Sequence, residues 1–238
     1  MLFRQLFDRE SSTYTYLIAD RASAEAILVD PVLEQVERDL KLLKELGLTL
    51  RYCLETHVHA DHITGAAQLR SVTGCLSVVP DRAQVECADQ SIRHGETLHV
   101  GEVEIQAIAT PGHTDSHMAY LVNGTHLLTG DALLIRGCGR TDFQSGDAGT
   151  LFDSVTQRVF TLPNATLIYP AHDYRGQTVS SVEEEKCWNP RFQGRSRDEF
   201  KQFMNELNLP DPQKMMEALP ANERCGQTPA MSANTYSI

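Results

Sequence analysis

The stretch Thr56-His57-Val58-His59-Ala60-Asp61-His62 places three histidines and one aspartate within six consecutive residues. Imidazole and carboxylate groups are the ligands that borderline divalent metals prefer in proteins. A lone histidine is usually a solvated side chain, but four such groups so close together are costly to leave unpaired and are readily satisfied by an ion. The stretch therefore predicts a metalloprotein.

Three further candidate ligands lie downstream, each after a short apolar run of high β-propensity. They are His113 in Thr110-Pro111-Gly112-His113-Thr114, Asp131 after Thr129-Gly130, and His172 after Tyr169-Pro170-Ala171. Residues just past the end of a strand lie on loops that a rigid sheet holds in place, where binding sites are usually built. We therefore expect all three to join the histidine cluster in one metal centre.

The composition of the 238-residue chain is that of an ordinary globular protein, with 41% apolar and 22% charged residues. This length suits one large domain or two small ones. The net charge of −11 argues against a nucleic-acid partner, because a protein that neutralises phosphates needs a basic face. No run reaches the ~18 apolar residues of a membrane helix, and the charges within residues 1–10 do not fit a signal peptide. We therefore expect a cytoplasmic protein that binds neither membranes nor nucleic acids.

The cysteines are scattered and form no CxxC pair, which excludes a zinc knuckle and a thioredoxin-like motif. In a reducing compartment they are expected to be free thiols. The set comprises Cys53, Cys75, Cys87, Cys138, Cys187 and Cys225.

Apolar periodicity predicts many strands with interspersed helices. Strands are expected at 13–19, 25–29, 48–55, 76–79, 97–100, 103–109, 118–122, 126–129 and 165–169, and helices at 33–46, 63–72, 150–160 and 197–207. Gly47 is the expected C-terminal stop of the first helix. Because the helices do not alternate strictly with the strands, we expect two packed sheets, each covered by helices. Residues 228–238 are small and polar and are expected to form a flexible tail.

In its order and spacing, the ligand set resembles that of the metallo-β-lactamase superfamily. The resemblance covers roughly residues 1–175 and rests on His57, His59, Asp61, His62, His113, Asp131 and His172. It implies an α/β (α+β) fold: an αββα sandwich of two mixed sheets flanked by helices, with the metal site at one edge. This superfamily hosts several chemistries, so the fold alone does not give the function.

Motifs further along the chain resemble those of the persulfide dioxygenases and extend the match to about residue 226. They are Gly137-Cys138-Gly139-Arg140-Thr141-Asp142-Phe143-Gln144, Tyr169-Pro170-Ala171-His172-Asp173-Tyr174, Val182-Glu183-Glu184-Glu185 with Asn189-Pro190-Arg191, and Pro220-Ala221-Asn222-Glu223-Arg224-Cys225-Gly226. The resemblance implies one domain over residues 1–227, in which residues 175–227 form a substrate-binding extension. It also implies the oxidation of glutathione persulfide by O2 to sulfite and glutathione.

The same resemblance implies one Fe(II) per chain, bound by His57, His113 and Asp131. Four residues would then lie around this site or form a second one: His59, Asp61, His62 and His172. Two histidines and one carboxylate leave coordination positions open on Fe(II), so that a persulfide sulfur and O2 can bind side by side.

The carboxylates of glutathione call for guanidinium groups, and its amides call for hydroxyl or carboxamide partners. The family motifs place Arg140, Tyr174, Arg191 and Asn222 in this recognition set, with Tyr174 and His172 as the catalytic candidates. Cys225 has two interpretations of equal weight: it faces the sulfur of the substrate, or it fills a small apolar gap. A separate rhodanese-type sulfurtransferase and a homodimeric partner are further expectations from the family.

The main alternative is a glyoxalase II-like thioesterase, which uses the same seven ligands to hold two metals and cleaves hydroxyacylglutathione with a bridging hydroxide. The metal cluster alone does not discriminate between the two enzymes. The region after His172 does, because it carries the persulfide dioxygenase motifs in place of the larger helical region of glyoxalase II. A third interpretation, a binding domain with a dead site, would predict a missing ligand, and all seven are present.

Overall fold

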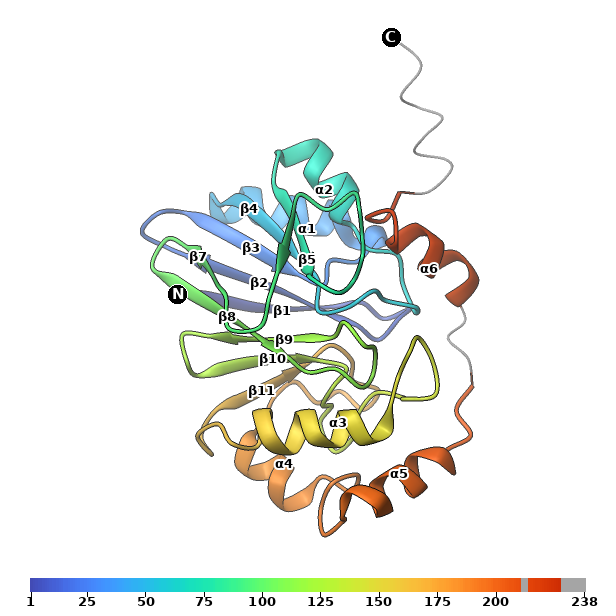
Figure 1. The fold of residues 1–238 in the computed structure, drawn as a ribbon. Coiled ribbons are helices and arrows are strands. Elements are labelled where there is room, and N and C mark those ends of the chain that lie inside the picture. Colours follow the sequence, from blue (N-terminus) through green and yellow to red (C-terminus); the bar gives the residue numbers. More distant parts are fainter. Residues whose placement is uncertain (211–213, 228–238) are drawn as a thin grey trace.

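Two six-stranded sheets pack face to face between two layers of helices (Figure 1). This architecture is seen in a computed structural model that describes residues 1–210 and 214–227, so the expected tail at 228–238 lies outside the described residues. The predicted αββα sandwich is confirmed. Among the described residues, no helix is long and apolar enough to cross a membrane.

The first sheet contains the six N-terminal strands in chain order. They are β1 (Leu2–Phe7), β2 (Tyr14–Asp20), β3 (Glu25–Val29), β4 (Thr49–Leu54), β5 (Leu76–Pro80) and β6 (Gln90–Ile92). Strands β1 to β3 are antiparallel, as expected for the first hairpin, and β3 to β6 run parallel. The ends of β3 and β4 therefore lie at the same edge of the sheet, and the histidine-rich stretch follows β4 there.

The second sheet has the order β12-β11-β10-β9-β8-β7. Its strands are β7 (Thr97–Val100), β8 (Val103–Ala109), β9 (Met118–Val122), β10 (His126–Gly130), β11 (Leu167–Pro170) and β12 (Ser180–Ser181). Strands β10 and β11 are parallel, and the other pairs are antiparallel. Both sheets are thus mixed, and the loops after β8, β10 and β11 deliver the three downstream ligands.

Helices cover the outer face of each sheet (Figure 1). After a 3-10 turn at Leu33–Gln35, α1 (Val36–Leu46) and α2 (Ala66–Thr73) lie on the first sheet; α3 (Ala148–Ser154), α4 (Val182–Trp188) and α5 (Arg197–Asn205) lie by the second. A last helix, α6 (Met215–Asn222), returns to the first half and packs on Ile63. Gly47 ends α1 with φ 65°, a left-handed conformation that glycine adopts without steric cost, as predicted.

Successive side chains of a strand point to opposite faces of its sheet, so the buried residues fall into separate layers of the core. In β2, Tyr16 and Ile18 pack between the two sheets, whereas Leu17 and Ala19 face the helices of the first half. Leu127 in β10 likewise joins the cluster under α3 and α5, with Phe200 at its centre. Strands buried on both faces read as nearly continuous apolar runs, which is why most were predicted.

Five elements were not predicted. They are β1, β6, β12, α4 and α6. The short strands β6 and β12 offer too few residues for a period to be seen, and α6 contains Pro220, which normally marks a helix boundary. The predicted helix at 150–160 begins earlier, at Ala148, and its second half is a π-helix at Val155–Val159.

Candidate metal centre

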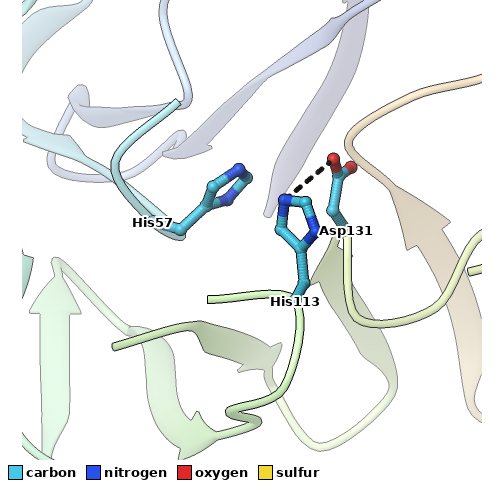
Figure 2. Close-up of side chains that lie close together, drawn as sticks. All are labelled: His57, His113 and Asp131. Atoms are coloured by element: carbon cyan, nitrogen blue, oxygen red, sulfur yellow. Dashed lines mark ion pairs between the residues drawn. The ribbon is translucent and has the colours of Figure 1, made fainter. Parts of the chain in front are cut away.

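Three of the seven predicted ligands converge at the edge of the two sheets (Figure 2). His57 comes from the loop after β4, His113 from the loop after β8, and Asp131 from the end of β10. One ligand atom from each lies within 4.8 Å of the others, and His113 Nε2 lies 3.6 Å from Asp131 Oδ2. A single ion with bonds of about 2.1 Å can be reached from all three after small side-chain shifts.

Hydrogen bonds fix both histidines of this cluster in the tautomer that a metal needs. The hydroxyl of Thr56 donates its only hydrogen to Asp30 Oδ2 at 2.9 Å, so His57 Nδ1 must donate to the Thr56 oxygen, also at 2.9 Å. His113 Nδ1 lies 2.7 Å from the carbonyl oxygen of Arg140, which can only accept. Both imidazoles therefore keep an unprotonated Nε2 for a metal, and these residues fit an ion.

The third ligand, Asp131, is bound to His172 on the side away from His113. His172 Nδ1 donates to Asp131 Oδ1 at 2.6 Å, and His172 Nε2 donates to Asp61 Oδ2 at 2.9 Å. Burial alone would lower the pKa of His172, but the two adjacent carboxylates outweigh it and raise that pKa well above its ordinary value. His172 thus holds Asp131 in a buried charged hydrogen bond, which is strong and directional.

The other predicted ligands form a second group beside the first. One ligand atom each from His59, Asp61 and His62 again lies within 4.8 Å of the others. Besides His172, Asp61 Oδ2 accepts from His62 Nδ1 at 3.0 Å and from the Thr13 hydroxyl at 3.2 Å. His59 Nε2 lies instead 3.1 Å from the buried carboxylate of Asp30.

A cavity of about 560 Å³ opens in front of the three-ligand cluster. His57, His113 and Asp131 form its floor, and three predicted substrate residues stand in its wall: Arg140, Tyr174 and Arg191. Its lining mixes apolar, cationic and acidic side chains, and its volume suits a small ligand.

The three wall residues differ in how far they are already engaged. The guanidinium of Arg140 is paired with Asp142 at 2.7 and 2.9 Å and donates to Pro210 O at 2.9 Å. Arg191 lies over the Phe203 ring at 5.0 Å, and its buried Nη1 finds no hydrogen-bond partner among the described residues. Tyr174 is 73% exposed at the rim, with its ring stacked 6.1 Å from that of His172.

Asn222, predicted as a substrate residue, does not line this cavity. Its buried amide nitrogen donates to the carbonyl oxygens of His59 and His62, both at 2.8 Å, and its amide oxygen accepts from Thr64 N at 2.9 Å. All three partners are main-chain groups of the ligand loop or its continuation. Asn222 therefore fastens α6 to the metal loop, and its predicted role in substrate binding stays a prediction.

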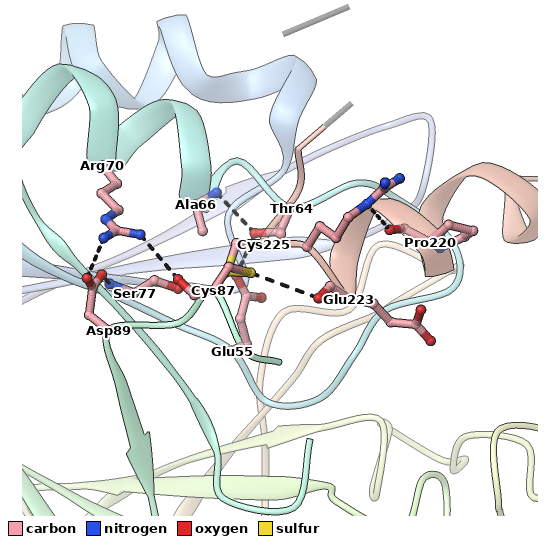
Figure 3. Close-up of a disulfide and its surroundings, with 11 residues drawn as sticks. Glu55, Thr64, Ala66, Arg70, Ser77, Cys87, Asp89, Pro220, Glu223 and Cys225 are labelled. Carbon is pink, nitrogen blue, oxygen red and sulfur yellow. Dashed lines mark hydrogen bonds and ion pairs between the residues drawn. A yellow bond between two sulfur atoms is a disulfide. The ribbon is translucent and has the colours of Figure 1, made fainter. Parts of the chain in front are cut away.

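Cys225 does not line this cavity either. It forms a disulfide with Cys87 (Figure 3). The expectation that all six cysteines are free thiols is wrong for this pair; Cys53, Cys75, Cys138 and Cys187 are free. The two bonded residues are 138 positions apart, so no local spacing reveals the pair. Of the two interpretations of Cys225, apolar packing is observed, against Val79 and Val85.

Two functional residues escaped the sequence reasoning, Asp30 and His117. Asp30 binds the backbone N–H and the hydroxyl of Thr56 and so orients His57. Burial first, and then the neighbouring His113, lower the pKa of His117 to about 3, so this imidazole is neutral at pH 7. The one available signal was the position of His117, four residues after His113 at the start of the next strand.

Comparison with known proteins agrees with this geometry. A sequence model of the metallo-beta-lactamase superfamily matches residues 8–172. The chain is 53% identical over 232 residues to proteins of Bos taurus and Homo sapiens named "Persulfide dioxygenase ETHE1, mitochondrial", covering 96% of this chain and 91% of each relative. The crystal structure of ETHE1 from Myxococcus xanthus superposes with a TM-score of 0.93 at 55% identity, covering 95% of this chain and 100% of that one.

A hydroxyacylglutathione hydrolase of Rhodospirillum rubrum is a more distant relative. It is 34% identical over 173 residues, which cover 71% of this chain and 66% of that protein. The persulfide dioxygenases thus match the chain at higher identity and over more of its length. The chain belongs to the metallo-β-lactamase superfamily and, within it, to the persulfide dioxygenase family.

Proposed function

We propose that this chain is an oxidoreductase that converts glutathione persulfide and O2 to sulfite and glutathione, with one Fe(II) held by His57, His113 and Asp131. The observation that carries the proposal is the 53% identity over 232 residues, which extends beyond the shared metal domain into the C-terminal region. In balanced form, one persulfide, one O2 and one water give one glutathione, one sulfite and two protons. Both oxygen atoms of O2 are transferred to sulfur.

Two histidines and one carboxylate are the ligand set of non-haem iron oxygenases with open positions. Bound Fe(II) supplies the redox chemistry that lets O2 react with the persulfide sulfur, which Zn(II) lacks. His57 and His113 offer neutral nitrogens for it, and His172 holds the carboxylate of Asp131 in place. The cavity in front of these side chains leaves room for the substrate sulfur.

Substrate recognition is assigned to the wall of this cavity. The planar guanidinium of Arg191, whose Nη1 has no partner within the part of the chain that the structure describes, suits a bidentate bond to a glutathione carboxylate. Arg140 adds positive charge to the same wall. Because its guanidinium is already paired with Asp142, we propose Arg191 as the main partner of the glutathione carboxylate. To the phenol of Tyr174, which also lines the cavity, we assign a hydrogen bond to the persulfide.

We further propose residues 1–227 as one domain in which 175–227 form the substrate-binding extension. Its helices join the cores of both halves, with Phe200 of α5 in the cluster under the second sheet and Ala218 of α6 packed on Ile63. A rhodanese-type sulfurtransferase as the separate source of the persulfide, a homodimer and a cytoplasmic location stay predictions.

The deciding experiment loads the protein anaerobically with Fe(II) and measures O2 uptake and sulfite with glutathione persulfide. The expected result is about one sulfite per O2. His113→Ala should abolish the activity because it removes a ligand, whereas His99→Ala, an exposed histidine on β7, should preserve it. The same preparation is assayed for thioester cleavage with S-lactoylglutathione. Thioester cleavage without O2 uptake, at two metals per chain, would establish the glyoxalase II-like hydrolase instead.

A further inference from the structure

We infer that His117 is a positioning residue of the metal centre, which holds the Asp131 carboxylate through its main chain and supports the rings of His57 and His113. His117 is buried at the end of the loop between β8 and β9 and is 1% exposed. Its Nε2 lies 3.0 Å from the backbone nitrogen of Asp131, and its Nδ1 lies 2.8 Å from the hydroxyl oxygen of Thr110.

These two contacts define the state of the ring. A peptide N–H can only donate, so Nε2 of His117 is the acceptor and carries no hydrogen. The single hydrogen of the neutral ring is then on Nδ1 and is donated to Thr110. Because both nitrogens are committed, His117 does not serve as a metal ligand and acts through Asp131 instead.

The close approach of this ring depends on the residue before Asp131. A Cβ built on Gly130 would lie 2.5 Å from His117 Nε2, closer than real contacts allow, and Gly130 has φ 51°. Glycine at this position therefore lets the end of β10 come against the imidazole. The N–H of Met118, the next residue along the chain, also donates to Thr56 O at 2.8 Å. Residues 117 and 118 thus tie the loop that carries Asp131 to the loop that carries His57.

His117 also packs against the two ligand imidazoles. Its ring is stacked on that of His57, with centroids 5.0 Å apart and an interplanar angle of 25°, and it meets the His113 ring edge-on at 6.1 Å. One neutral side chain therefore contacts all three groups that would hold the metal. Partners of this kind outside the ligand set typically change metal affinity by about 10- to 100-fold when they are removed.

Two substitutions separate the hydrogen bond from simple packing. His117→Phe keeps an aromatic face on His57 but leaves the N–H of Asp131 without an acceptor. His117→Gln loses the ring but supplies an amide oxygen near the position of Nε2. As a matched control, His126→Phe changes a ring at the opposite end of β10, where it stacks on Tyr169.

The probe is Co(II) alone, whose visible absorption reports both affinity and ligand geometry, followed by steady-state kinetics of the iron-loaded enzyme. This inference rests on the metal centre of the proposed function, but Co(II) binding tests it whichever reaction the site performs. We expect His117→Phe to weaken Co(II) binding by about 10- to 100-fold, to alter its spectrum and to lower kcat with little change in KM. We expect His117→Gln to bind Co(II) within a few-fold of the parent and His126→Phe to match the parent.

Unchanged Co(II) affinity and spectrum in His117→Phe would overturn the inference. A loss in His117→Gln at least as large as that in His117→Phe would also overturn it, because restoring the acceptor would then bring no recovery. Circular dichroism and thermal melting of the metal-free proteins verify folding. Should His117→Phe not fold, Thr110→Val decides, because it removes only the acceptor of Nδ1–H. A several-fold loss of Co(II) affinity in that variant supports the positioning role, and parent-like binding refutes it.

Discussion

Replacing Asn222 with alanine should detach the C-terminal region from the metal loop. The side chain lies on α6, yet it makes three buried hydrogen bonds, at 2.8, 2.8 and 2.9 Å, to the main chain around the ligands. Alanine removes the two donors that face the carbonyl oxygens of His59 and His62 and the acceptor that faces Thr64 N. The variant therefore leaves three main-chain groups of the loop without these partners.

The magnitude follows from these contacts. A buried hydrogen bond contributes about 1 kcal/mol net, and a buried group left unsatisfied costs about 1–3 kcal/mol. Three bonds, with partial relief from water entering the vacated space, give a loss of about 3 kcal/mol in the free energy of unfolding. For a chain of this length, a loss of that size lowers Tm by roughly 6–12 °C.

The assay is urea and thermal unfolding of the metal-free protein, with Co(II) affinity measured beside it. Asn222→Asp is the sharper variant, because it keeps an acceptor for Thr64 N but turns a carboxylate oxygen towards two carbonyl oxygens, so it should be at least as unstable as alanine. Asn164→Ala, at an exposed position, should stay within about 0.5 kcal/mol of the parent. A loss below 1 kcal/mol in Asn222→Ala would refute the clamp, as would an Asp variant as stable as the parent.

Three further predictions address other parts of the chain. The denatured, unreduced protein should show four reactive thiols. Reductant should lower Tm in the parent but not in Cys87→Ser, because the disulfide to Cys225 closes a loop of 138 residues. By chain entropy this disulfide stabilises the folded state by at most about 5 kcal/mol. Arg191→Lys should raise KM for glutathione persulfide about 10-fold with little change in kcat, whereas Arg195→Lys, outside the cavity, should not. Burial raises the pKa of Asp39, so the proton is bound more tightly in the folded state. The stabilisation from this bound proton is complete below the ordinary pKa of 3.8 and is lost as pH rises through the pKa of Asp39 in the folded state. As pH rises above about 4, the urea concentration at half-unfolding should therefore fall less steeply for Asp39→Asn than for the parent.

The sequence predicted what local chemistry determines. The strands of both sheets are apolar on one or both faces, so apolar periodicity was enough to predict most of them. Gly47 was likewise enough to predict where α1 ends. The candidate ligands could be named because metals restrict the choice of side chain, and the fold brings His57, His113 and Asp131 together. Asn222 and Cys225 could not be placed in this way, since their partners are main-chain groups and a disulfide-bonded cysteine more than a hundred residues away. The role of His117 depends likewise on the fold, which brings the N–H of Asp131 to its ring.

The number of metals at this centre is a prediction, and the contacts of two aspartates bear on it more than the ligand list does. All seven side chains of a two-metal site are present, so their identity cannot separate an iron oxygenase from a dinuclear hydrolase. Asp61 Oδ2, however, already accepts from Thr13, His62 and His172, so a second ion would have to displace these bonds. Asp30 acts on the other side: it orients His57 towards the cavity through Thr56 and holds His59 Nε2 within 3.1 Å. His57, His113 and Asp131 are thereby presented to a metal, whereas the second group is only partly engaged, because both ring nitrogens of His59 and Nε2 of His62 find no hydrogen-bond partner among the described residues. A single ion at His57, His113 and Asp131 stays a prediction.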